Sequence, residues 1–236
     1  HLYHYAGNNP VRYIDPDGRT SGYLNDSDSV GGAGHSAMFV ETYDANGNSS
    51  GFDLYEVGSV RNENGTWVGV GADGNAIKDT EVLSHDSLDE SMGNVVGSII
   101  GGSGLISGSG GSVAINSASS GSAIGQSGIN SVNVESGVFV RHYDSYAEMQ
   151  NAPENSRYNN VITFNTTKSQ DIAIRNTAIL SGKNFGKYNL FTNNCTQHAS
   201  GSLKAGGINS TRFLIPNSAT RFILKNNSNY VRTSWR

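Results

Sequence analysis

Short apolar and β-branched runs separated by turn residues fill much of the chain between residues 34 and 164. The first run covers residues 34–43 and is followed by Asn46-Gly47, a dipeptide typical of β-hairpin turns. A second run at 52–57 completes the predicted hairpin. Three further runs predict strands, at 67–70 (before a turn at Asp73-Gly74), at 138–143 and at 161–164. The pattern therefore predicts an antiparallel sheet.

Helical signals come late in the chain. The Thr-Lys-Ser-Gln sequence at 167–170 fits a capping box and predicts a helix that Gly182 ends. A second helix is expected over 195–205, after three residues that favour N-caps. A third follows a Pro-Asn-Ser sequence, with Asn217 or Ser218 as its N-cap. Strands followed by helices predict one α+β domain.

Two segments interrupt this pattern. Residues 21–34 read as a polar, glycine-rich leader, and residues 91–137 as a Gly/Ser-rich insertion between the sheet and the helices. Residues 91–134 contain no charged side chain, but glycine breaks up their apolar positions. A membrane-spanning helix needs about 20 mostly apolar residues. We therefore expect a loop or glycine-rich hairpin rather than a membrane span.

The amino-acid composition excludes several kinds of binding site. The chain has 236 residues, a net charge of −4 and one cysteine. Without a basic cluster to neutralise phosphates, no nucleic-acid partner is expected. A single cysteine excludes an internal disulfide and a cysteine-based zinc site. His85 and His142 lack partners at metal-ligand spacing, so neither a metal nor another cofactor is predicted.

Cys195 lies at the predicted start of the second late helix. Free amide groups and the helix dipole stabilise a thiolate there, and the thiolate is the nucleophilic form. The same amides can bind an oxyanion. The alternative is a buried cysteine that packs as a small hydrophobic residue. Local sequence alone leaves both interpretations open.

His35 begins the first apolar run and is the candidate base for this thiol. Pairing across Asn46-Gly47 brings residues 53–59 back toward His35. The residue that orients the imidazole is then Glu56 or Asp53, and Glu56 is favoured because it lies nearer the expected pairing partner of His35. The alternative for each carboxylate is a solvent-facing position on the strand with no role in the site. His198, one turn after Cys195, is interpreted as a structural helix residue rather than a modulator of the thiol.

Taken together, Gly34-His35 and Asn194-Cys195 are similar to motifs of the circularly permuted papain-like fold, which includes NlpC-type peptidases and lecithin–retinol acyltransferase-like enzymes. In that group a histidine on a strand precedes a cysteine at a helix N-terminus. The resemblance implies Cys195 as nucleophile, His35 as base and a third residue on the strand paired with the histidine strand. The Gly/Ser-rich insertion departs from the family pattern.

The first twenty residues resemble the end of an RHS-repeat core domain. In that family an Asn-Pro followed by Asp-Pro-x-Gly closes a large β-cage before a variable C-terminal effector; here the matches are Asn9-Pro10 and 15–18. Some members use an aspartate of this motif to release the effector after a downstream leucine, whereas Arg19 follows the motif here. The implied organisation is an RHS tail over 1–20 and a toxin domain over 21–236.

These resemblances imply a secreted toxin, or one delivered into a target cell within a larger RHS protein. The expected activity is hydrolysis of an amide bond by Cys-His catalysis, on a peptide such as the stem peptides of peptidoglycan, and the expected partners are the upstream cage and a cognate immunity protein. Deamidation, transglutamination and acyl transfer occur on the same fold and stay open. Two non-enzymatic alternatives are a binding module displayed by the cage and a membrane-active toxin that uses residues 91–134.

Overall fold

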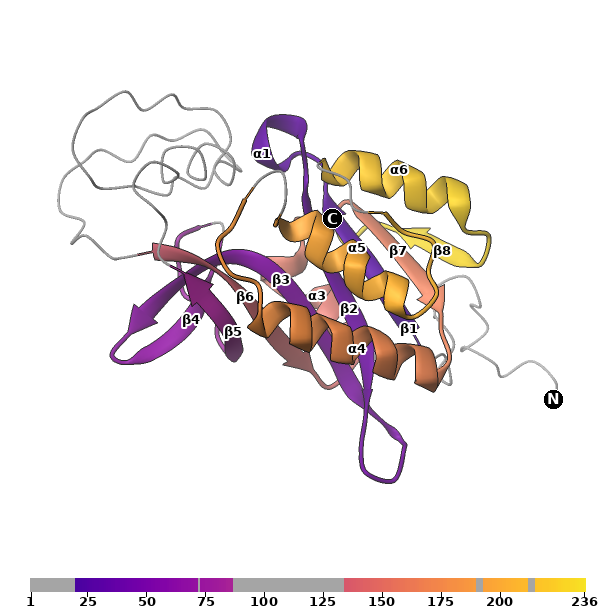
Figure 1. Cartoon of the computed structure of the whole chain (residues 1–236), viewed down its shortest axis with the longest axis horizontal. Coiled ribbons are helices and arrows are strands. Elements are labelled where there is room, and N and C mark those ends of the chain that lie inside the picture. The colour runs from indigo at the N-terminus through magenta and orange to yellow at the C-terminus, as the bar shows by residue number, and fades with distance from the viewer. Residues whose placement is uncertain (1–19, 72, 87–133, 190–192, 212–214) are drawn as a thin grey trace.

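The computed structural model describes residues 20–71, 73–86, 134–189, 193–211 and 215–236. The described strands form one sheet in the order β5-β6-β3-β2-β1-β7-β8, with β4 paired to the far end of β3 (Figure 1). Every pairing is antiparallel, as predicted. The strands are β1 (Thr20–Asp26), β2 (His35–Tyr43), β3 (Ser49–Glu63), β4 (Thr66–Val70), β5 (Thr80–Asp86), β6 (Val134–Tyr143), β7 (Asn160–Asn165) and β8 (Tyr230–Thr233).

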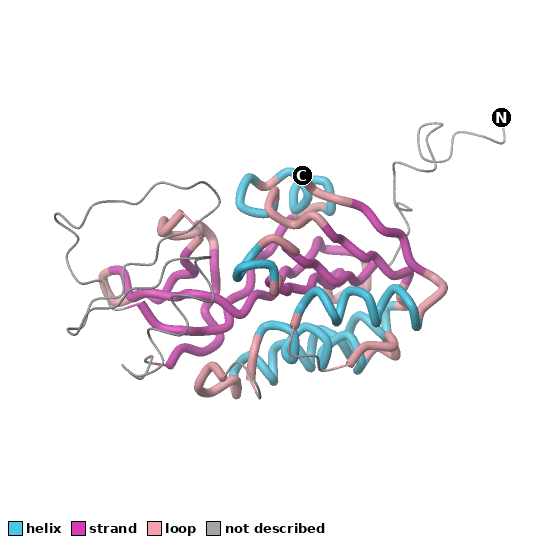
Figure 2. The backbone as a smooth tube through the Cα atoms, turned by 90° about the horizontal axis from the view of Figure 1, so that it is seen from above, coloured by secondary structure: helices cyan, strands magenta, loops and turns pink. Residues whose placement is uncertain are grey.

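Helices pack on the sheet to give an α+β fold, as expected. Three of them pack against one face, which Figure 2 shows nearly edge-on: α4 (Lys168–Lys183), α5 (Cys195–Ala205) and α6 (Pro216–Asn226). The opposite face is covered by α3 (Tyr146–Asn151), the 3₁₀ turn η2 (Pro153–Asn155) and the C-terminal Trp235. A short helix, α1 (Ser29–Gly32), precedes β2. None of the helices in the described residues is long and apolar enough to cross a membrane.

Alternation along the strands separates two cores. Met38 and Val40 of β2 face the long helices, whereas Ala37 and Phe39 face α3 and Trp235. On β3, Tyr55 belongs to the first core and Leu54 to the second. Neighbouring side chains on one strand therefore pack into different cores.

The prediction of a leader over residues 21–34 is wrong. Its first half is β1, which lies in the middle of the sheet between β2 and β7 and is buried along its whole length. Its polar side chains bind other buried groups: Ser21 Oγ donates to Asp171 Oδ1 at 2.7 Å, and Tyr23 Oη lies 2.5 Å from Ser36 Oγ. β1 also includes Thr20, the first of the described residues.

Other predicted boundaries also differ from those in the structure. Most of the 91–137 insertion lies outside the described residues, but its last four residues belong to β6. The helix with the Thr167 capping box is confirmed, yet it continues past Gly182, which packs closely against Leu83 rather than ending the helix. α6 begins at Pro216, and its N-cap is Ile215. Neither expected capping residue acts as the cap; Asn217 Nδ2 instead donates to the carbonyls of residues 27 and 32 in the segment before β2.

Replacing Asp171 with alanine tests the burial of β1. The Asp171 carboxylate is fully buried and accepts hydrogen bonds from the hydroxyl groups of Ser21, Tyr43 and Thr166. Asp171→Ala removes the shared acceptor of these three hydrogen bonds, so we expect the free energy of unfolding to fall by about 3 kcal/mol. Urea denaturation measures this change. The exposed Asp144→Ala serves as control and should change stability by less than about 0.5 kcal/mol; equal losses would contradict the assignment.

Candidate functional site

Cys195 is the first residue of α5. Asn194 is the N-cap, and its side chain accepts a hydrogen bond from the Gln197 amide at 3.0 Å. Asn194 therefore has the capping role that its sequence position favours. Cys195 is 8 % exposed and packs in a cluster with Val57, Val138 and Phe185.

His35 lies at the first position of β2, opposite Asp26 of β1. The structure brings its imidazole and the thiol of Cys195 close enough to interact. The backbone of Ser36 also acts to lower the pKa of this thiol. Gly34 allows the close approach of α6 here: its φ is +94°, and a Cβ would lie 2.8 Å from Asn217 Oδ1.

Glu56 is the carboxylate that meets His35. It pairs with Ala37 in the β2–β3 register, and its Oε1 lies 3.3 Å from His35 Nε2. Because Nε2 faces Glu56, the other ring nitrogen, Nδ1, is available to the thiol. The three predicted residues therefore form a connected thiol–imidazole–carboxylate arrangement.

Asp53 does not take part. It pairs with Val40 and faces the other side of the sheet, where its carboxylate binds His142 Nδ1 at 2.9 Å and Arg175 Nε at 2.8 Å. The alternation of β3 separates it from Glu56, three residues along the strand.

Sequence reasoning missed two arginines that bind Glu56. Arg141 Nη2 donates to Glu56 Oε2 at 2.6 Å, and Arg157 Nη2 donates to Oε1, the oxygen that also faces His35. Arg141 is 2 % exposed and Glu56 is 1 % exposed. The available signal was Arg141 itself, a charged residue within an apolar strand run; nothing local marked Arg157.

These contacts decide the protonation of the site. Burial alone would raise the pKa of Glu56, but Arg157, His35 and Arg141 hold it well below its ordinary value. Burial would likewise lower the pKa of His35; its contacts with Cys195 and Glu56 outweigh this and raise it to about 9. For Cys195 burial favours the neutral thiol, yet His35 brings its pKa below the ordinary value. Both shifts move the pair toward the thiolate and the imidazolium.

Two other histidines in the described residues, His198 and His85, have structural contacts. His198 is buried, lies 3.2 Å through Nε2 from the Ala178 carbonyl, and has its pKa lowered by burial to about 4. His85 stacks on Trp67 with 3.8 Å between ring centroids. Within the described parts of the chain, no group of three or more His, Cys, Asp or Glu side chains is arranged to hold a metal ion.

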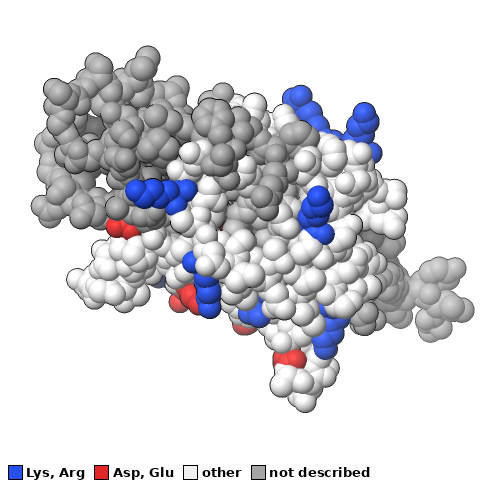
Figure 3. Space-filling model, viewed as in Figure 1, with Lys and Arg blue, Asp and Glu red and all other residues white. Residues whose placement is uncertain are grey.

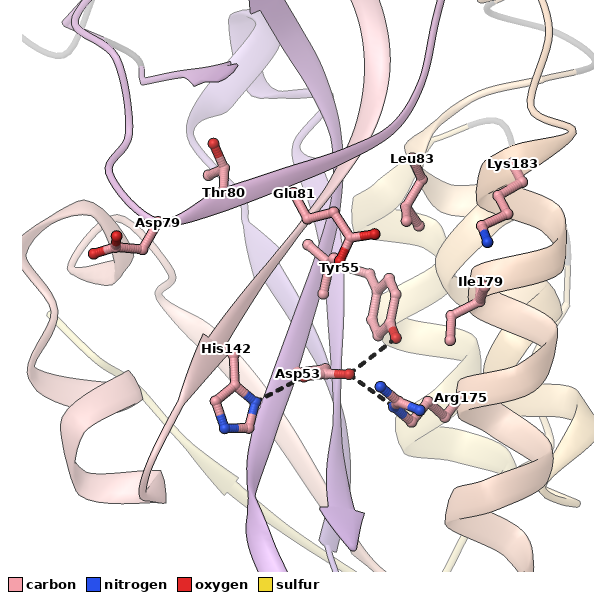
Figure 4. A pocket seen from close by; sticks show the side chains of 11 residues that line it. Asp53, Tyr55, Asp79, Thr80, Glu81, Leu83, His142, Arg175, Ile179 and Lys183 are labelled. Atoms are coloured by element: carbon pink, nitrogen blue, oxygen red, sulfur yellow. Dashed lines mark hydrogen bonds and ion pairs between the residues drawn. The ribbon is translucent and has the colours of Figure 1, made fainter. Parts of the chain in front are cut away.

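A groove of about 550 Å³ lies apart from the thiol, between α4 and β5 (Figure 4). Tyr55 and Asp53 line it from β3, Arg175 and Lys183 from α4. Leu83 lines the groove and also packs against the cluster that contains Cys195. Leu83 thus lies between the groove and the Cys195 cluster. On the face shown in Figure 3, Lys and Arg are scattered rather than gathered in one patch.

The pH dependence of alkylation tests the thiol–imidazole pair. We expect the rate of Cys195 modification by iodoacetamide to rise in two steps, one below the ordinary thiol range and one near pH 9, where His35 loses its proton. His35→Ala removes the partner and leaves a buried thiol whose pKa is raised. The rate at pH 7 should then fall ~30-fold. A His35→Ala profile identical to wild type would refute the contact.

Glu56→Gln tests the buried charge cluster. The substitution leaves two arginines without their shared carboxylate, so we expect a loss of about 3–5 kcal/mol in the free energy of unfolding at pH 7. Because the Glu56 pKa is lowered on folding, this stabilisation is complete above the ordinary value of 4.5 and is lost as the pH falls through the folded value. The difference between variant and wild type should therefore shrink in acid. Asp53→Asn is the control: it should cost less and leave alkylation unchanged.

Comparison of the chain with protein-family models, with curated proteins and with solved structures finds no match.

Proposed function

We propose that the chain is a cysteine hydrolase of amide bonds, with Cys195 as nucleophile, His35 as proton shuttle and Glu56 as the residue that orients His35. The observation that carries the proposal is the contact of a helix N-terminal thiol with a histidine whose second ring nitrogen faces a buried carboxylate. A cysteine that served only for packing would need neither partner.

The reaction follows from these positions. The Cys195 thiolate attacks the carbonyl carbon of the amide, and negative charge moves to the carbonyl oxygen. The backbone amides in the first turn of α5 are the proposed donors to that oxygen. Imidazolium at His35 then protonates the leaving nitrogen as the C–N bond breaks, which leaves a thioester on Cys195. A water molecule gives one proton to His35, its oxygen attacks the thioester, and the acid product leaves as the thiolate re-forms.

The permuted papain-like fold is part of the proposal. Its support is the order of the parts: a histidine strand, a carboxylate on the strand paired with it, and a later helix that begins at the cysteine. A peptide, such as a stem peptide of peptidoglycan, is the proposed substrate. An amine in place of water as acceptor would turn the same thioester chemistry into transglutamination, and a side-chain amide as substrate would turn it into deamidation.

We further propose that the domain is the C-terminal toxin of an RHS-family protein, secreted or delivered as part of it, and that an immunity protein covers the site in the producing cell. Residues 1–19, which carry the RHS-like motif, lie outside the described residues. Support comes from the sequence resemblance of residues 9–18 to the RHS motif. The 91–134 stretch of the membrane-active alternative falls almost entirely outside the described residues.

Growth of bacteria that express residues 1–236 tests the function. The chain is directed in turn to the cytoplasm and the periplasm, alongside Cys195→Ala, His35→Ala and the control Asp53→Asn. We expect the wild type and Asp53→Asn to stop growth in one compartment, and both site variants to lose toxicity at equal protein level. Killing by Cys195→Ala as strong as by wild type would refute the thiol mechanism.

A second readout identifies the bond. Mass spectrometry of the wild-type protein mixed with purified peptidoglycan or with a peptide library should detect a thioester adduct on Cys195 and newly formed carboxyl ends. Neither product should form with Cys195→Ala. Toxicity of the wild type without any such adduct or product would contradict amide hydrolysis.

A further inference from the structure

Arg157 and Arg141 bind the same carboxylate differently. Arg141 binds Oε2 of Glu56, the oxygen turned away from His35, and shares its charge with Glu154 through a 2.8 Å contact. Arg157 binds Oε1, the same oxygen that contacts His35 Nε2. Its guanidinium lies over the Tyr158 ring at 5.0 Å and donates to the Tyr158 hydroxyl at 3.1 Å, which fixes its position.

The charges around His35 come from several elements. Glu56 of β3 and Cys195 of α5 contact the imidazole and favour its protonated form, whereas Arg157 opposes it. Asp26 of β1 lies opposite His35 in the register, but Arg236 binds its carboxylate. Arg157 is therefore the cation that acts on His35 through a shared oxygen.

We propose that Arg157 is a positioning residue that shares Glu56 Oε1 with His35 and thereby limits how strongly the carboxylate retains the imidazolium proton. Arg157 and Arg141 together keep Glu56 ionised and fixed, so the carboxylate still orients the ring. The competition at Oε1 and the nearby positive charge weaken its hold on the proton. The lowering of the His35 pKa by Arg157 agrees with this geometry.

The chemical role rests on the proposed function. His35 must give its proton to the leaving nitrogen and later take one from water, and an acid whose pKa lies far above the working pH does the first step poorly. A buried carboxylate and a thiolate both act to raise that pKa. Arg157 offsets part of their effect through Glu56.

Alkylation of Cys195 in the full chain, followed against pH, tests the proposal without a substrate. Arg157→Gln removes the positive charge, so the alkaline transition should move from near pH 9 upward by about one pH unit. Arg157→Lys keeps a charge but lacks the forked group, so the shift should be smaller and in the same direction. The matched control is Arg175→Gln, which removes an arginine bound to Asp53 on the other side of the sheet and should leave the transition in place.

The outcomes separate the two proposals. An alkaline transition that stays at the wild-type pH in both Arg157 variants overturns the role of Arg157 and leaves the thiol mechanism intact. A wild-type profile with a single transition at the ordinary thiol pKa overturns both. If Arg157→Gln fails to fold, as judged by circular dichroism, Arg157→Lys decides alone, because its ammonium still supplies a charge beside the buried carboxylate. The shift of the His35 imidazole NMR signals with pH gives an independent reading.

Discussion

The buried carboxylate of Glu56 is the interaction on which the rest of the site depends. An ionised carboxylate that is 1 % exposed is costly unless cations surround it. Here β2 supplies His35, β6 supplies Arg141, and the segment between η2 and β7 supplies Arg157. A shift of one residue in the pairing of β2 with β3 would turn Glu56 to the other face and leave these cations without their partner. The charge cluster and the strand register therefore support each other.

The site joins the two sides of the sheet. Glu56 belongs to the face covered by α3 and Trp235, whereas Cys195 arrives on α5, which packs on the opposite face. His35 is the first residue of β2, so its ring can reach both the thiol and the carboxylate at the end of the strand. A histidine in the middle of the strand would be confined to one side. The location of the pair at a strand end is thus a geometric requirement.

Local signals in the sequence were sufficient for much of this arrangement. Asn46-Gly47 set the hairpin that brings Glu56 to His35, and the N-cap at Asn194 marked the helix that begins with the thiol. The buried strand β1 was missed because its polar residues are satisfied by groups far away in sequence, such as Asp171. Arg157 was missed for the same reason. The periodicity of apolar residues along the sequence predicts which apolar side chains are buried. It does not predict polar side chains that are buried with partners far away in the sequence.

The place of β1 has a consequence for the order of folding. This strand is synthesised before its neighbours, yet Thr20 pairs with Asn165, and β7 in turn needs β8 near the end of the chain. Contacts of such large sequence separation form late and slowly. During synthesis one edge of β1 stays open until most of the chain has emerged. Cys195 comes later in the chain than His35, Glu56 and both arginines, so the thiol can meet them only after the start of α5 has been made.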